Sequence, residues 1–220
     1  MLAFGPDGMS RRAFLTSLAA AATLAAADPF ASVVVDGQRY RNGRIGLSVL
    51  MPEGWEYESV ADFVALRDRE VIRTGLISEV APYGRAEDIP ILLCVDPRHR
   101  SGHFAPACGA WDEPHQPHWS AAAAPALGHF LDVFSSVYRD LVVDRAPSRR
   151  PVPGAPNAAV AEWSYVHEID DGTRQPLWVR SMVTIKDGRI GLFHFVDDRD
   201  DPRVDRSTWD EFSGSVAYDP

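Results

Sequence analysis

The last third of the chain alternates apolar and polar residues in three segments that are separated by Asp-Gly pairs. The sequence DDGT joins residues 159–169 to residues 174–186, and KDGR leads from there into residues 189–196. Asp-Gly between two alternating segments is a strong signal for a β-hairpin with a tight turn. The pattern therefore predicts a three-stranded antiparallel meander.

A two-residue turn in each hairpin would pair Asp170 with Thr173 and Lys186 with Arg189. On this register one face of the meander collects Trp163, Tyr165, Trp178, Met182, Phe193 and Phe195. The other face collects Val160, Val166, Leu177, Val179, Val183, Ile190 and Leu192. Because both faces are apolar, both must be covered. We therefore expect an α+β fold, an α/β/α sandwich with a mostly antiparallel sheet.

Further elements are predicted on either side of this meander. Apolar residues recur at three- and four-residue steps, as on one face of a helix, at Leu127, Phe130, Phe134, Val137, Tyr138 and Leu141. Ser207 can cap a short last helix whose Trp209 and Phe212 face the sheet. Residues 43–52 and 89–95 each contain an apolar run that predicts a strand.

Three polar stretches are expected outside the regular elements. Residues 96–120 contain four prolines and two glycines, which predict a long irregular insert. Residues 145–156 are rich in proline and are expected to form a surface linker. The acidic residues 197–201 are expected in a surface loop. Of these stretches the insert is the candidate for function, because long loops are often functional.

The insert carries five possible metal ligands, namely His99, His103, Cys108, His115 and His118. Imidazole and thiolate suit copper or zinc, although these spacings match no standard zinc finger. In the alternative interpretation the insert is a polar loop in which Cys108 forms a disulfide with Cys94. The 13 residues between them would close a loop worth about 3 kcal/mol, provided that the two Cα atoms come within bonding range.

The N-terminal residues have the three parts of a secretion signal. Arg11 and Arg12 precede an apolar run at residues 13–24, and small residues 25–27 offer a cleavage site before Asp28. The order SRRAFL resembles the twin-arginine signal pattern S-R-R-x-F-L. This resemblance implies export of the folded chain across the cytoplasmic membrane, into the periplasm or the medium. The run is too short to span a bilayer, so we expect no membrane span once residues 1–27 are removed.

The remaining 193 residues, 28–220, suit a single domain with a sizeable core. The whole chain has 22 basic and 31 acidic residues. Residues 1–27 hold two of the basic residues and one of the acidic residues, so residues 28–220 carry a formal net charge of −10. An acidic body is repelled by nucleic acid and by anionic membrane surfaces. Nucleic acid is therefore not expected as a partner.

The domain resembles the PsbP-like superfamily in two short motifs, GLSVLMPEGW near its start and WDEFSGSV near its end. The positions that carry the resemblance are Leu47, Pro52, Trp55, Phe212 and Ser215. It spans roughly residues 40–218 and implies an α/β/α sandwich whose relatives mostly bind proteins or stabilise assemblies, with no common catalytic residue to carry over. The NTF2-like cone is the runner-up, because VTIKDGRIGLFHFV fits it, although that fold usually begins with helices.

Two clusters on the predicted meander are candidates for chemistry. Glu162, Ser181 and His194 share a row and resemble an acid, a hydroxyl and a base, but a nucleophile in mid-strand lacks the oxyanion donors of acyl transfer. On the other face a ligand site is possible at Arg180, Trp163 and Trp178, where the arginine can also simply stack on a ring.

We assign no catalytic residue and expect an exported, non-catalytic domain. It would act by contact or assembly with another exported or membrane-associated protein. Two alternatives stay open, a copper- or zinc-binding protein that uses the insert and an enzyme with a pocket against the sheet.

Overall fold

The computed structural model describes residues 33–57, 90–99, 106–117, 119–168, 172–201 and 207–220. The larger sheet contains β4 (Glu56–Tyr57), β5 (Leu92–Val95), β6 (Ala107–Pro114), β7 (Arg139–Arg149), β8 (Ala158–Glu168), β9 (Arg174–Lys186) and β10 (Arg189–Asp198). The smaller sheet contains β1 (Val33–Asp36), β2 (Arg39–Asn42), β3 (Leu47–Leu50) and β11 (Ala217–Tyr218). The helical elements are α4 (Ala123–Val137), α5 (Ser207–Ser215) and the short 3-10 turn η2 (Pro97–His99). The predicted signal at residues 1–27 lies outside the described residues.

The strands form two antiparallel sheets, as the predicted α+β class requires. The order in the larger sheet is β4-β5-β6-β10-β9-β8-β7, and the order in the smaller sheet is β1-β2-β3-β11. Neighbouring strands in both sheets run antiparallel. Within the described residues, neither α4 nor α5 is long and apolar enough to cross a bilayer.

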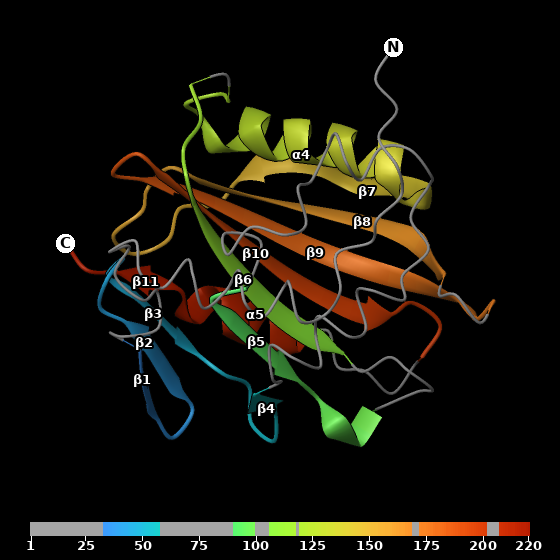
Figure 1. Ribbon diagram of the computed structural model, residues 1–220, viewed down its shortest axis with the longest axis horizontal. Coiled ribbons are helices and arrows are strands. Elements are labelled where there is room, and N and C mark those ends of the chain that lie inside the picture. The colour runs from blue at the N-terminus through green and yellow to red at the C-terminus, as the bar shows by residue number, and fades with distance from the viewer. Residues whose placement is uncertain (1–32, 58–89, 100–105, 118, 169–171, 202–206) are drawn as a thin grey trace, which may run out of the picture.

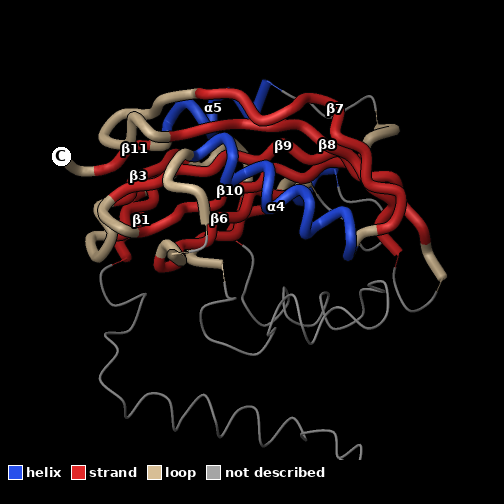
Figure 2. Tube along the Cα trace, turned by 90° about the horizontal axis from the view of Figure 1, so that it is seen from above, coloured by secondary structure: helices blue, strands red, loops and turns tan. Residues whose placement is uncertain are grey.

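Both faces of the larger sheet are covered, as the two apolar faces of the meander predict. Helix α4 lies on one face (Figure 1). Its Leu127 and Leu131 join a buried cluster there with Trp163 and Val179. The opposite face carries α5 and the smaller sheet, whose side chains pack with Phe193 of β10 in a second cluster. Figure 2 shows the same layers from above, with α4 and α5 on either side of the strands. A helix on each face matches the expected sandwich, and the smaller sheet is an addition to it.

The predicted register is correct for one hairpin and wrong for the other. Lys186 pairs with Arg189 in β9–β10, as KDGR predicts. In β8–β9, however, Trp163 lies opposite Val179, one residue away from its predicted partner Arg180. The ladder ends with Glu168 opposite Arg174, which leaves five connecting residues where the prediction had two. A shift by one residue moves every side chain of a strand to the other face.

This shift changes the composition of the two faces. Trp163 and Tyr165 lie under α4, whereas Trp178, Met182, Phe193 and Phe195 lie on the α5 side. Val160 packs on the α5 side as well, and Val166 follows it by alternation along β8, although both were expected on the other face. The remaining five residues expected on the second face, Leu177, Val179, Val183, Ile190 and Leu192, do share the α4 side.

Part of the expected irregular insert is a central strand. Residues 107–114 form β6, which lies between β5 and β10 and pairs with β10 over eight residues. Its prolines do not interrupt the ladder, because Pro106 precedes the strand and Pro114 is its last residue. Gly109 makes room for an aromatic side chain, since a Cβ atom there would lie 2.6 Å from the Trp111 ring.

Two further expectations are corrected at the ends of elements. Helix α4 ends at Val137, and Tyr138 already has an extended backbone, so Leu141 belongs to β7. Strand β7 also takes in residues 145–149 of the expected linker. Asp197 and Asp198 belong to β10, and Asp197 is fully buried, so the expected acidic loop begins only after them.

Two glycines give a matched test of this packing. At Gly154 the backbone φ is +72°, and a Cβ atom would lie 2.1 Å from the carbonyl oxygen of Tyr218 in β11. Gly154→Ala is expected to lower the free energy of unfolding by about 2 kcal/mol or more, from strain and the clash together. Gly128→Ala, in α4 with no atom within 4 Å of the new Cβ, is expected to raise it by about 0.5–1 kcal/mol. Urea unfolding followed by tryptophan fluorescence measures both, and equal effects at the two positions would contradict the close approach of β11.

Candidate functional site

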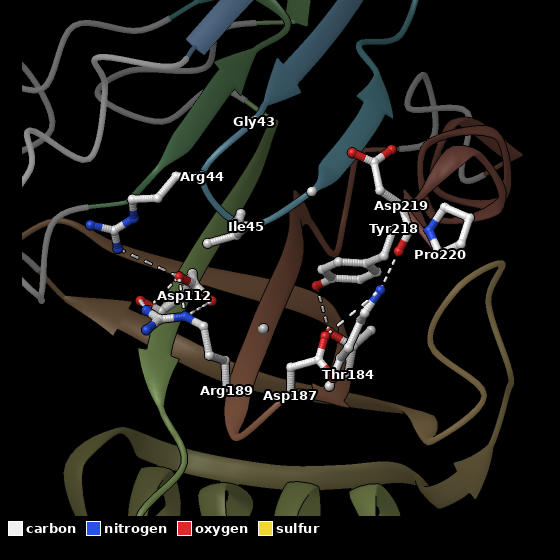
Figure 3. Close-up of a pocket in the computed structure, with 13 residues that line it drawn as sticks. Gly43, Arg44, Ile45, Asp112, Thr184, Asp187, Arg189, Tyr218, Asp219 and Pro220 are labelled. Carbon is white, nitrogen blue, oxygen red and sulfur yellow. Dashed lines mark hydrogen bonds and ion pairs between the residues drawn. The ribbon is translucent and has the colours of Figure 1, made fainter.

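A cavity of about 330 Å³ lies where the two sheets meet, and charged side chains line it. The β2–β3 turn at residues 43–46 forms one wall, and the end of the β9–β10 hairpin forms another. Asp112 of β6 and Tyr218 of β11 complete the lining (Figure 3). The sequence analysis proposed none of these residues as a site. Their positions are far apart along the chain, and only the pairing of the strands brings them together.

Two guanidinium groups meet one buried carboxylate at one side of this cavity. The Asp112 side chain is 6% exposed, and the Nε of Arg189 lies 2.9 Å from its Oδ2 and 3.0 Å from its Oδ1. The Nη2 of Arg189 donates to the same Oδ2 at 2.6 Å. The Nη2 of Arg44 approaches Oδ2 to 3.8 Å from the β2–β3 turn. Together the three side chains leave one formal positive charge at this side.

The opposite side combines a hydroxyl pair with an ammonium group and two carboxylates. The hydroxyls of Tyr218 and Thr184 lie 2.7 Å apart, and burial raises the pKa of Tyr218 to about 12. Lys186 donates to the carbonyl oxygen of Asp219 and lies 3.9 Å from a carboxylate oxygen of Asp187. The tyrosine hydroxyl is therefore neutral at ordinary pH and acts here as a hydrogen-bonding group.

A glycine keeps the cavity open between these two sides. A Cβ atom on Gly191 of β10 would lie 2.5 Å from the Tyr218 hydroxyl oxygen and 2.6 Å from the Thr184 hydroxyl oxygen. Any larger residue would have to displace that hydroxyl pair. The lack of a side chain at Gly191 thus preserves both the hydrogen bond and the space beside it.

The predicted row of acid, hydroxyl and base is only partly correct. Ser181 and His194 are paired, and the Ser181 hydroxyl lies 2.7 Å from Nδ1 of His194. Their third neighbour is Trp163, whose Nε1 donates to the Ser181 oxygen at 2.8 Å. Glu162 lies on the other face of the sheet, opposite Arg180, because of the one-residue shift in β8. The expected association of Glu162 with Ser181 and His194 is therefore wrong.

The geometry of this cluster favours a structural role. Trp163 can only donate, so the Ser181 hydroxyl accepts from Trp163 and donates its own hydrogen bond to Nδ1 of a neutral His194. Ser181 is fully buried and is closed off from any substrate. His194 is surrounded by the rings of Trp111, Phe134 and Trp163, and burial lowers its pKa to about 4.

Arg180 links strand β8 to helix α5 on the α5 side of the larger sheet. Its guanidinium carbon lies 5.1 Å from the centre of the Trp178 ring, as the stacking interpretation expects. It also forms ion pairs with Glu162 at 2.8 Å and with Asp210 of α5 at 3.0 Å. Trp163 lies on the opposite face, so the structure does not assemble the three proposed ligand-binding residues Arg180, Trp163 and Trp178.

The described members of the proposed metal set are not assembled either. Cys108 lies near the start of β6, and His115 follows its end. Seven residues of strand separate their backbones by about 20 Å, so the two cannot bind one ion. Within the described ranges, no group of three His, Cys, Asp or Glu side chains is arranged to hold a metal. His103, His118 and the side chain of His99 lie outside those ranges.

The two cysteines are neighbours but are not bonded. Cys94 and Cys108 lie directly opposite each other in β5 and β6, and both are buried free thiols. The thiol of Cys94 donates to the carbonyl oxygen of Cys108 at 3.6 Å. Burial raises the pKa of the Cys108 thiol, which disfavours the thiolate. The structure thus has two free thiols where the sequence analysis considered a disulfide between Cys94 and Cys108.

Comparisons with known proteins give a likeness in fold. No protein-family model matches the chain, and no curated protein matches it. The chain is similar to the solution structure of cyanobacterial PsbP (CyanoP) from Synechocystis sp. PCC 6803, with 14% identity and a TM-score of 0.47. The alignment covers 84% of this chain and 98% of that chain. At this level of similarity, no residue role and no function passes from that protein to this one.

The neutral histidine under α4 makes stability depend on pH. His194 has a pKa of about 4 in the fold, below its usual value near 6.5, so the unfolded chain binds more protons between these pH values. Stability contributed by neutral His194 is present in full above pH 6.5 and is lost as the pH falls towards 4, by up to about 3 kcal/mol.

Urea unfolding of the wild type at pH 7.5 and pH 5 measures this loss, and His194→Gln is expected to reduce it. His129→Gln, on the exposed side of α4, should keep the wild-type difference. An unchanged difference in His194→Gln would show that this imidazole is not kept neutral by the fold.

Proposed function

We propose that this chain is an exported, non-catalytic domain that acts by binding another exported protein along the edge of its larger sheet. The observation that carries this proposal is the exposed edge strand β7. In the part of the chain that the structure describes, β7 is the last strand of the larger sheet, and it is 11 residues long. An edge strand presents unpaired backbone groups that can add a strand from a partner.

The centre of β7 is unusually apolar for an exposed edge. Val142 is 53% exposed and Val143 is 44% exposed. Val142 and Val143 pair in register with Ser164 and Trp163, so their side chains point to opposite faces of the sheet, and each is accessible on its own face. Adjacent exposed apolar side chains at an unpaired strand edge favour contact with the side chains of an added strand.

Charged residues flank this apolar centre on both sides. Asp140 precedes it and Asp144 follows it, and Arg145 forms an ion pair with Glu162 at 3.0 Å. Natural edge strands carry such charges to prevent indiscriminate pairing. The arrangement favours a specific partner, one that offers an extended apolar segment of about three residues between groups able to pair with the two aspartates.

Export is proposed from the N-terminal sequence. The paired Arg11 and Arg12 before a short apolar run support the twin-arginine route. An acidic domain that crosses the membrane already folded would arrive with its edge strand formed and ready to bind.

Site-specific cross-linking tests the edge. A photoreactive phenylalanine analogue at position 142 of the full chain, expressed in its own host, is expected to form an adduct with one exported protein. The same probe at exposed Glu211 on α5 should not. Val143→Lys should reduce the adduct at least about fivefold, because a charge at the centre disfavours strand addition. Val34→Lys, on the exposed strand β1, serves as the matched control.

The partner's contact segment, found by mass spectrometry, should cross-link back to β7 when it carries the probe. Equal adducts from positions 142 and 211, or an adduct that survives Val143→Lys, would exclude the edge as the contact surface.

A second experiment tests the export route. Replacing Arg11 and Arg12 together by lysine is expected to keep the protein in the cytoplasm, because the proposed signal depends on paired arginines. Fractionation and immunoblotting of the host measure the exported share, with Arg39→Lys in the described domain as a control. Unchanged export of the double variant would reject the twin-arginine assignment.

A further inference from the structure

We propose that Cys94 and Cys108 are a modification site, at which an oxidising disulfide outside the cytoplasm closes an intramolecular disulfide in the folded domain. The two free thiols of the structure are then the form in which the chain folds and is exported. This step rests on the export proposed for the chain, because the cytoplasm keeps thiols reduced, whereas disulfides form in the periplasm and outside the cell.

The strand register places the two backbones at a distance that a disulfide can bridge. Cys94 lies directly opposite Cys108 in the antiparallel ladder of β5 and β6. Two residues further along β5, the backbone amide of Asp96 donates to the carbonyl oxygen of Pro106 at 2.9 Å. Hydrogen-bonded and non-hydrogen-bonded pairs alternate, so Cys94 and Cys108 are also a hydrogen-bonded pair, with Cα atoms about 5.5 Å apart. Disulfides join Cα atoms that lie about 4.4–6.8 Å apart.

The two thiols also lie on the same face of the sheet. Both side chains belong to the buried cluster with Trp55 and Phe195 on the α5 side. The Cys94 thiol reaches the carbonyl oxygen of Cys108 at 3.6 Å. Burial, and then a hydrogen bond with the Cys94 thiol, raise the pKa of the Cys108 thiol. Closing the bond takes side-chain rotation and an approach of the Cβ atoms by about 1 Å, from about 4.5–5.5 Å to about 3.5–4.5 Å.

The bond forms by thiol–disulfide exchange. One cysteine loses its proton, and its sulfur attacks the external disulfide, which forms a mixed disulfide and releases one half of the oxidant as a thiolate. The second cysteine then loses its proton, and its sulfur attacks the first and displaces the other half of the oxidant as a thiolate. The two cysteines thus lose two protons and two electrons, and the oxidant gains both and becomes two thiols.

Burial decides when this exchange takes place. Neither cysteine side chain is exposed, and the raised pKa of Cys108 disfavours the thiolate that has to react. The exchange therefore needs local opening of the ladder. In the described part of the sheet, β4 pairs with β5 over two residues and β5 pairs with β6 over four, against eleven in β8–β9. Short ladders open at a lower free energy than long ones, so oxidation proceeds from this margin of the sheet.

Oxidation of the purified full chain, in its reduced form, tests the pair without relying on export. Incubation with oxidised glutathione is expected to give a chain that is lighter by two hydrogen atoms in mass spectrometry and retains no glutathione. Its melting temperature is expected to exceed that of the reduced chain by at least about 4 °C, because the cross-link restricts the unfolded chain.

Four results of this experiment would overturn the proposal. They are a glutathione adduct that persists on either cysteine, a disulfide between two chains, free thiols after unfolding and refolding in the same buffer, and an oxidised chain that melts below the reduced one. The double variant Cys94→Ala/Cys108→Ala is the matched control. It should keep one melting temperature in oxidising and reducing buffers, and a difference that persists in it would count against the disulfide as the source of the stabilisation.

Thiol trapping in the host tests the compartment. Alkylation of acid-quenched, denatured cells is expected to modify neither cysteine in the exported wild-type chain. Both cysteines should be modified when Arg11 and Arg12 are replaced by lysine and the chain stays in the cytoplasm. Two free thiols in the exported wild type would overturn the proposal. Export of the double lysine variant would reject the signal assignment alone, and the glutathione experiment then decides on the thiol pair.

Discussion

The fold depends on the burial of both sides of one strand. From Leu177 to Thr184 of β9, every side chain except Arg180 is buried. Because successive side chains of a strand point to opposite faces, this burial requires cover from two directions. Helix α4 supplies one cover, and α5 together with the smaller sheet supplies the other. The two-sided apolar strand thus explains why the chain builds a three-layer structure.

The polar residues within this strand tie the covering layers to it. Ser181 is linked to Trp163 and His194 under α4. Arg180 is linked to Asp210 of α5, and Thr184 is linked to Tyr218 of the smaller sheet. Arg180 and Thr184 thus have partners in two different covering elements, whereas the partners of buried Ser181 lie on neighbouring strands of the same sheet. These links place the covering elements, and the one at Thr184 also forms the wall of the cavity.

The parts of the structure that local pattern determines could be predicted from the sequence. The sequence KDGR predicts the register of β9–β10, and Trp209 and Phe212 predict the buried side of α5. The register of β8 could not be predicted, since DDGT does not reveal how many residues the connection uses, and one residue decides on which face Trp163 lies. Strand β6 was not predicted, because glycine and proline usually interrupt strands. Whether they do so depends on their place in the ladder, and in β6 the proline is the last residue. The cavity has no local signal at all, because Arg44, Asp112 and Tyr218 meet only through strand pairing.

The pairing of β11 with β3 has a consequence for the order of events during synthesis. Ala217 pairs with Ser48, which the ribosome adds 169 residues earlier. Until β11 emerges, β3 has a free edge within a chain that already contains β1, β2 and the larger sheet. Contacts between segments so far apart in the sequence form late and lower the rate of folding. Completion of the smaller sheet therefore has to follow translation of β11, and until then the edge of β3 that β11 covers is open to pairing with a neighbouring nascent chain.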